Sequence, residues 1–161
     1  MKVYHGSLER VETPEIRHSN RTLDYGFGFY VTTSYEQAEA WVKRRMGGHK
    51  VTKGYVNEYF LDKEKVNGLN GLSFNEPTEE WLDFVMANRT DRNFIHFYDV
   101  VYGPVANDRV YAAFALYEGG VLDKQTLIKE LKTYKLVDQF LFHTSKSLRA
   151  LTFIQAKEVV L

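Results

Sequence analysis

Cysteine is absent from the 161 residues, which excludes disulfide bonds and thiolate chemistry. Its absence is compatible with a reducing compartment. No apolar run approaches the ~20 residues that a membrane-spanning helix needs, and the first residues lack a secretory-signal pattern. We therefore expect a cytoplasmic protein that does not contact a membrane.

An excess of charge of one sign is also absent, because 21 Lys and Arg residues balance 21 Asp and Glu residues. The chain therefore has no overall basic field for a nucleic-acid backbone, although a local basic patch is not excluded. Arg17, His18 and Arg21 either contact phosphates or solvate a loop. The run Lys43-Arg44-Arg45 either solvates a helix face or touches a target.

Several motifs of metal and nucleotide chemistry are missing. The five histidines, at positions 5, 18, 49, 96 and 143, show no paired ligand spacing, so we expect no metal site. The absence of a Gly-x-x-x-x-Gly-Lys loop argues against P-loop nucleotide hydrolysis. The absence of a Gly-x-Ser-x-Gly elbow argues against a serine hydrolase.

The length of the chain predicts one domain spanning residues 1–161. Tyr and Phe number 11 each, a high aromatic content that predicts aromatic-lined walls as well as an aromatic core. The sequence pattern predicts strands over 2–6, 28–33, 54–61, 97–102, 139–143 and 153–160, and helices over 34–46, from 78 to about 89 and from 123. Residues 62–77 read as loop, and residues 110–116 as strand or helix. Without strict alternation, this order favours the α+β class.

The helix over 34–46 has its own start and stop signals. Ser34 followed by Gln37 is typical of a capping box, and Gly47-Gly48 should end the helix. The helical spacing places four residues on the buried face: Ala38, Trp41, Val42 and Met46.

Two glycine-containing stretches carry the functional signal. Gly26-Phe27-Gly28-Phe29-Tyr30-Val31-Thr32-Thr33 puts two glycines at the start of a strand, which indicates positive φ or a close approach to the backbone. Alone, this pattern is typical of a turn beside a core strand. Val3-Tyr4-His5-Gly6-Ser7 is a short β-type run in which the glycine would let a ligand reach the backbone. A lone histidine there is more often structural than catalytic.

Together these stretches resemble the first two strands of the ADP-ribosyltransferase superfamily. More narrowly, the chain resembles a small bacterial family within that superfamily, catalogued as a domain of unknown function. Two later blocks share the resemblance, 98–108 (Tyr-Asp-Val-Val-Tyr-Gly-Pro-Val-Ala-Asn-Asp) and 138–144 (Asp-Gln-Phe-Leu-Phe-His-Thr), followed by Ser147, Leu148 and Leu151. The resemblance implies split antiparallel sheets with flanking helices around an NAD cleft.

The histidine-tyrosine-glutamate branch of the superfamily supplies roles for individual residues. It implies that His5 bonds the adenosine ribose and that the Gly6 backbone bonds the nicotinamide carboxamide. Ser7 would add a hydroxyl donor. Tyr30 would stack on the nicotinamide ring, where a cationic pyridinium gains roughly 1 kcal/mol or more from an aromatic face. The alternative for Tyr30 is a core tyrosine.

The third position of the branch departs from the pattern. Gln139 stands where the branch has a glutamate that bonds the ribose at the scissile bond. Glutamine can bond a ribose hydroxyl but carries no charge. Asn107 and Asp108 read as turn residues on propensity alone. Within the family they would line the cleft, and Asp108 could supply the charge that Gln139 lacks.

The resemblance implies a mono-ADP-ribosyltransferase that consumes NAD, without a metal, and modifies a protein or nucleic-acid acceptor. A bacterial toxin with an inhibitor or antitoxin protein as partner is an extension from the family alone. Two alternatives stay open. One is an NAD glycohydrolase, and the other is a catalytically silent NAD-binding or protein-binding module of the same fold.

Overall fold

The computed structural model describes residues 1–18, 23–105, 108–134 and 136–161, apart from the side chains at 108, 109 and 111. Its elements in chain order are β1 (Lys2–Ser7), β2 (Phe29–Val31), α1 (Tyr35–His49), β3 (Lys53–Leu61), α2 (Lys63–Asn67), β4 (Gly71–Ser73), α3 (Glu79–Thr90), β5 (Val100–Pro104), α4 (Asp108–Glu118), α5 (Lys124–Leu131), β6 (Asp138–Phe142), the 3-10 helix η1 (Ser145–Ala150) and β7 (Leu151–Val160).

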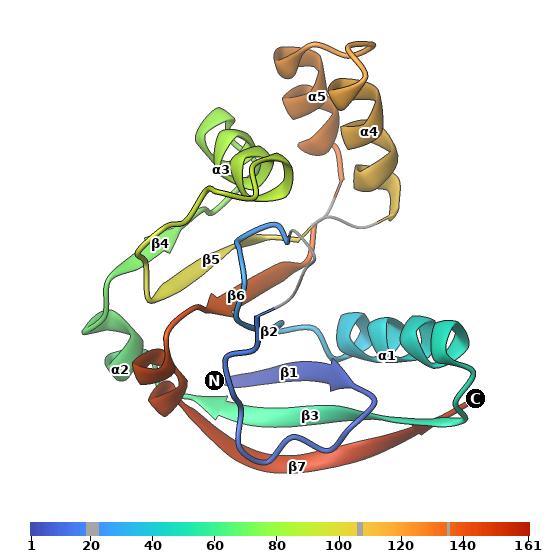
Figure 1. Ribbon diagram of the computed structural model, residues 1–161, viewed down its shortest axis with the longest axis vertical. Helices are drawn as coiled ribbons and strands as arrows, with labels where there is room; N and C mark the ends of the chain where they lie inside the picture. The colour runs from blue at the N-terminus through green and yellow to red at the C-terminus, as the bar shows by residue number, and fades with distance from the viewer. Residues whose placement is uncertain (19–22, 106–107, 135) are drawn as a thin grey trace.

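The strands form two sheets that lie one above the other (Figure 1). The first sheet is antiparallel, with the strand order β1-β3-β7. The second has the order β2-β6-β5-β4, and β4 runs parallel to β5. The α+β class is therefore confirmed, whereas the expectation of purely antiparallel sheets is wrong at β4.

Three apolar clusters divide the molecule into layers. α1 covers the outer face of the first sheet through Ala38, Val42 and Met46. The cluster between the two sheets contains Val3, Phe29, Val31, Tyr59, Leu61, Val100 and Phe142. The cluster between the second sheet and α3, α4 and α5 contains Tyr25, Trp81, Leu82, Phe114, Leu127, Leu131 and Leu141. The two faces of β2 and β6 thus belong to different layers.

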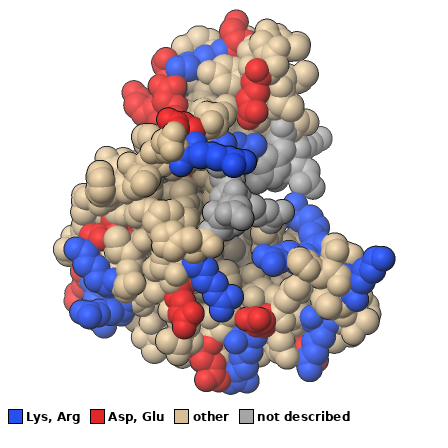
Figure 2. Space-filling model, in the orientation of Figure 1, with Lys and Arg blue, Asp and Glu red and all other residues tan. Residues whose placement is uncertain are grey.

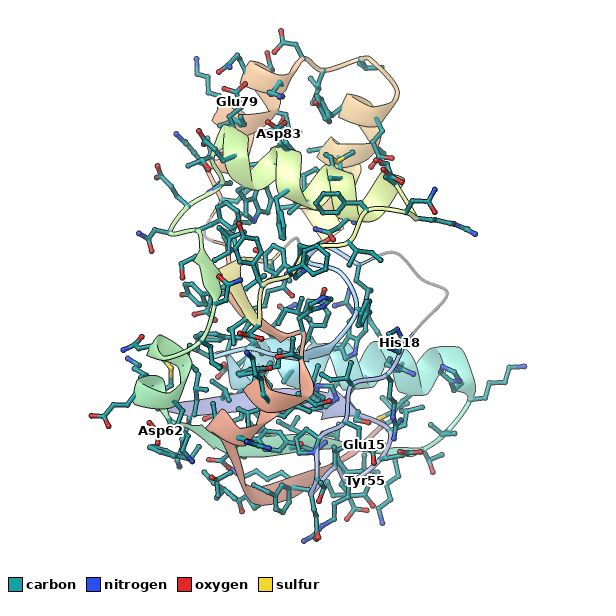
Figure 3. All side chains as sticks on the ribbon, turned by 60° about the vertical axis from the view of Figure 1, so that its left-hand side comes forward. Glu15, His18, Tyr55, Asp62, Glu79 and Asp83 are labelled. Carbon is teal, nitrogen blue, oxygen red and sulfur yellow. The ribbon has the colours of Figure 1, made fainter. Side chains whose placement is uncertain are left out.

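Helices α3 and α5 are tied together at one end. Lys124 Nζ lies 2.7 Å from Asp83 Oδ1 and 3.5 Å from Glu79 Oε1. Figure 3 shows the two acidic residues together on α3. Asp123 caps α5 as expected, because its carboxylate accepts from the Thr126 N–H at 2.7 Å.

α1 is longer than its sequence pattern predicts. Ser34 caps it as expected, accepting from the Gln37 N–H at 3.2 Å. However, the helix passes through Gly47 and Gly48 and ends at His49, and Lys50 caps it with a positive φ of 55°. Glycine costs a helix about 1 kcal/mol relative to alanine, which does not stop a helix whose other face is buried. Trp41 was expected on that face but is 40% exposed.

For residues 110–116, which were predicted as strand or helix, the structure has helix α4. Other element predictions are corrected. Residues 62–77 contain α2 and β4 rather than loop alone. The strand predicted over 97–102 begins at Val100 and includes Gly103 and Pro104. An added Cβ at Gly103 would collide with the Tyr25 hydroxyl, so this glycine allows a close approach instead of ending the strand.

Candidate functional site

β1 and β2 touch at one point and then separate. Tyr4 exchanges both of its backbone hydrogen bonds with Thr32, at 2.8 and 2.9 Å, in an isolated bridge. Continuing this antiparallel register would place Gly6 opposite Tyr30. Instead, the Tyr30 carbonyl accepts a hydrogen bond from the His5 ring, with 2.7 Å between oxygen and Nδ1. The two sheets therefore split at Gly6 and Tyr30.

His5 is fixed as a neutral ring with one defined tautomer. A carbonyl only accepts, so Nδ1 carries the proton and Nε2 is left as an acceptor. Burial lowers the pKa of His5 to about 4, against the opposing effect of the Tyr30 bond, and the charges of Arg45 and Arg17 lower it further. The ring stacks on Phe29 at 4.1 Å between centroids. At neutral pH, the Nε2 atom of His5 can accept a hydrogen bond from a hydroxyl group.

Gly6 has a structural reason of its own. A Cβ at this position would lie 2.5 Å from the Ala38 carbonyl oxygen and 2.8 Å from Val42 Cγ2, both on α1. The glycine thus lets α1 pack directly on β1. Because strand N–H and C=O groups alternate in direction, the main-chain groups of Gly6 point to the same edge as those of Tyr4. At Gly6, however, that edge has no β2 partner.

Tyr30 uses its hydroxyl within the fold. It donates to the Gly26 carbonyl at 2.5 Å and accepts from the Tyr25 N–H at 3.1 Å. The ring packs on the cluster below α3, α4 and α5 and is half-buried. Gly26 has a φ of 88°, a backbone conformation that favours glycine, as its place before the strand predicts. Tyr30 therefore holds this turn while part of its ring stays exposed.

Gln139 lies on the same face as Tyr30. Tyr30 is opposite Leu141 in the β2–β6 pairing, and Gln139 is two residues before Leu141. Such a diagonal pair has Cα atoms about 7–8 Å apart. Gln139 is only 8% exposed. Its Nε2 makes no hydrogen bond of good geometry among the described residues, yet the amide lies against the Tyr25 hydroxyl: burial raises the pKa of that hydroxyl, and contacts with Trp81 and Gln139 oppose the rise. A buried amide that is paired imperfectly costs free energy, which marks this position as unusual.

The predicted residues come together only in part. The structure joins His5 to Tyr30 through the main chain of β2, and it places Tyr30 beside Gln139. However, His5 stacks on Phe29, whose side chain lies in the layer between the sheets. β2 therefore separates the His5 ring from Gln139.

The remaining predicted positions are less defined. The Ser7 hydroxyl accepts from the Glu9 N–H at 3.1 Å and so begins a turn. Asn107 lies outside the described residues. Asp108 begins α4, but its side chain lies outside them too.

Asp138, next to Gln139, holds the start of α1 in place, a role that sequence reasoning missed. Its Oδ1 accepts from the Thr33 N–H at 3.1 Å and from the Thr33 hydroxyl at 2.6 Å. Its Oδ2 accepts from the Tyr102 hydroxyl at 2.9 Å. Asp138 belongs to a quoted sequence block, but neither partner lies near it in the chain.

Basic side chains lie near the split between the sheets. Figure 2 shows Lys and Arg spread over this face among Asp and Glu, with some of them beside the middle of the molecule. Arg17 and Arg45 are both exposed and both act on the charge state of His5. Figure 3 labels His18, the neighbour of Arg17, which lies beside helix α1 in that view. An anionic group beside His5 would therefore meet positive charge.

Two cavities lie away from His5 and Tyr30. One of about 330 Å³ lies between α2 and the second sheet, with Leu61, Tyr102 and Phe140 in its wall. The other, of about 260 Å³, lies between Pro77, Pro104 and Tyr134. Neither includes a predicted site residue, so the candidate site rests on the split of the sheets.

Among the helices that the structure describes, none has the length and apolar character of a membrane-spanning segment.

The structure shows a two-sheet α+β protein, and a comparison with protein families identifies the family of the chain. A family model described as "Protein of unknown function (DUF3990)" matches residues 1–153. The chain therefore belongs to this family, as the resemblance to a domain of unknown function predicts. No curated protein and no solved structure matches the chain. Its place in the ADP-ribosyltransferase superfamily stays a prediction.

Proposed function

We propose that this protein is a mono-ADP-ribosyltransferase. It would cleave the nicotinamide–ribose bond of NAD and transfer ADP-ribose to a macromolecular acceptor. The observation that supports this most is the split of the two sheets at Gly6 and Tyr30, next to a neutral His5. A toxin role with a dedicated inhibitor protein extends the proposal from the resemblance alone.

The groups around the split suit the parts of NAD. The carboxamide of nicotinamide has a donor and an acceptor, which match the C=O and N–H of Gly6. His5 Nε2 suits a ribose hydroxyl, since it is an acceptor at neutral pH. Arg17 and Arg45 suit the diphosphate, because guanidinium groups bind phosphate oxygens in pairs. The partly exposed ring of Tyr30 suits a cationic pyridinium.

Gln139 would orient the ribose while the glycosidic bond breaks. The bond breaks through a cation-like transition state, so positioned dipoles contribute most of the catalysis. The Gln139 Nε2 makes no hydrogen bond of good geometry among the described residues, and a bound sugar oxygen would compete with the Tyr25 hydroxyl for this donor. Such contact requires the ribose to reach the Tyr30 face of β2.

A nicotinamide-release assay on three proteins tests the proposal. Gln139→Ala should lower release about a hundredfold, which is the effect of losing one preorganised contact. Gln139→Glu should retain or raise release, because a carboxylate also stabilises developing positive charge. NAD affinity, followed by thermal shift, should change little in both variants. If Gln139→Ala equals an active wild type, the role assigned to Gln139 is wrong.

A second candidate function is favoured by the state of Gln139. The residue carries no charge and is 8% exposed, which suits an NAD-binding module without transfer activity. In that case all three proteins would bind NAD and none would release nicotinamide. Release without any acceptor, equal to release with one, would instead indicate an NAD glycohydrolase.

A further inference from the structure

The segment between α3 and β5 exposes apolar side chains. Ile95 is 59% exposed and Phe97 is 85% exposed. Phe94 is 37% exposed and packs edge-on against Phe84 of α3, with 6.2 Å between the ring centroids. Their neighbours face inward, since His96 is buried and Tyr98 packs on the core cluster. We call Phe94, Ile95 and Phe97 the apolar ridge. Contiguous apolar groups on a protein surface commonly mark an interaction site.

Hydrogen bonds hold the backbone of this segment in place. Asn70 Nδ2 donates to the Phe97 carbonyl at 3.1 Å. The His96 ring accepts from the Tyr98 N–H through Nδ1 at 3.2 Å and donates through Nε2 to the Tyr25 carbonyl at 2.7 Å. The exposure of the ridge is thus part of a fixed conformation. A prearranged surface loses less conformational freedom when it binds.

The ridge is connected to the candidate site by direct contacts. His96 bonds the Tyr25 carbonyl, and the next carbonyl, that of Gly26, accepts from the Tyr30 hydroxyl. His143, at the end of β6, packs its ring on both sides, 4.1 Å from His96 and 4.4 Å from Phe27. A molecule bound at the ridge would therefore lie beside the turn that Tyr30 holds.

From these contacts we propose that the apolar ridge docks the acceptor, and that the acceptor is a protein with an apolar groove. This deepens the proposed transferase function and rests on it. A nucleic acid would need several cations for its phosphates, whereas residues 91–99 hold one exposed cation, Arg92, beside Asp91 and Asp99. A stable dimer needs roughly 20–30 residues a side, far more than the ridge offers. A brief contact with a protein substrate fits this small surface.

Transfer of labelled ADP-ribose tests the docking role. The probes are biotin-tagged NAD with nuclease-treated soluble protein from a bacterial lysate and, separately, purified RNA and DNA. The variant Ile95→Ser/Phe97→Ser should lower incorporation into protein at least about tenfold, as expected for interface anchors. Val121→Ser is the matched control, because Val121 is apolar and 71% exposed but lies between α4 and α5. It should label protein to within about twofold of wild type.

Nicotinamide release without acceptor separates the two proposals. If wild type, ridge variant and control release it equally while only the ridge variant loses protein labelling, the ridge docks the acceptor. Unchanged protein labelling by the ridge variant, or labelling of nucleic acid alone, would overturn the docking role. Absence of release in all three would instead count against the proposed function.

A cross-linking measurement tests whether the protein at the ridge is the acceptor. Phe97→p-benzoylphenylalanine should give a discrete adduct with a protein that also carries the biotin-tagged ADP-ribose, whereas the same group at Val121 should give none. No adduct at position 97, or an adduct with a second copy of this chain, would contradict the proposal.

Discussion

Each residue at the split between the sheets also stabilises the fold. His5 satisfies the Tyr30 carbonyl, Gly6 admits α1, and the Tyr30 hydroxyl pairs with two backbone groups of the 25–26 turn. Substitutions at these positions will therefore change stability as well as any NAD response. Each test of the site needs a stability measurement beside it.

Gly6→Ala should destabilise the protein by about 1–3 kcal/mol, the usual cost of forcing an extra carbon into a packed interface. The new methyl would meet the Ala38 carbonyl and Val42 on α1. Gly48→Ala is the control, because an added Cβ there has no neighbour within 4 Å and the residue lies in a helix. This change should stabilise by about 0.5–1 kcal/mol. Urea unfolding measures both, and equal midpoints would contradict the packing explanation.

Tyr30 allows its ring and its hydroxyl to be tested separately. Tyr30→Phe should cost roughly 1–2 kcal/mol of stability, because it leaves the Gly26 carbonyl and the Tyr25 N–H without their partner. It should keep the thermal-shift response to NAD, since the ring face is retained. Tyr30→Ala should lose that response, at roughly 1–3 kcal/mol of binding. An equal NAD shift in wild type and Tyr30→Ala would rule out stacking on Tyr30.

At the scale of elements, Asp138 couples β6 to the start of α1 and to β5. Its carboxylate accepts three hydrogen bonds, two from Thr33 and one from Tyr102. Hydrogen bonds to a charged group contribute more than neutral ones. These three hydrogen bonds fix where β2 ends, and therefore where Tyr30 lies.

Asp138→Ala should lower the free energy of unfolding by about 2–3 kcal/mol. Tyr102→Phe removes only one of the three bonds and should cost about 1 kcal/mol. If the two residues act through this bond, the double variant should be more stable than the sum of the two losses predicts. Chemical unfolding of the four proteins provides the cycle. Strict additivity would mean that the bond contributes nothing.

Elements with strong local patterns could be predicted from the sequence, and those that depend on distant partners could not. The caps at Ser34 and Asp123 and the buried face of α3 are local signals, and all three are present. β4 has only three residues and depends on pairing with β5. Trp41 has helical spacing, but it is 40% exposed and Arg44 packs over its ring.

The candidate site shows the same division. The two glycines before β2 indicated a positive φ or a close approach to the backbone, which the structure bears out at Gly26 and Gly28. At Gly6, where a ligand was expected to reach the backbone, the close neighbour in the structure is α1. No local signal could reveal that the buried Gln139 amide lies against the Tyr25 hydroxyl, or that His5 lies on the opposite side of β2 from Gln139. Both depend on the register between strands far apart in the sequence.

At the scale of the whole molecule, folding buries histidines in the layers around β2. Burial lowers the pKa of His5 to about 4 and also lowers the pKa of His96. Both rings are used as neutral hydrogen-bonding groups. The unfolded chain, where histidine titrates near 6.5, therefore binds more protons than the native protein in mildly acidic solution.

Stability should consequently fall as the pH drops from about 6.5 toward 4. Between pH 6.5 and 4, His5 binds a proton in the unfolded state but stays neutral in the native state. The free energy of unfolding therefore rises with pH across this range. Above 6.5 both states are neutral at this position and the contribution is constant.

His5→Asn keeps an N–H for the Tyr30 carbonyl but does not titrate. Between pH 7 and 4.5, wild type should lose about 2 kcal/mol more than this variant. His96 and the carboxylates of Glu58 and Asp99, whose pKa values are also lowered, are common to both proteins and cancel in the comparison. Urea unfolding at half-unit pH steps measures the difference, and parallel curves for the two proteins would show that His5 is not held neutral.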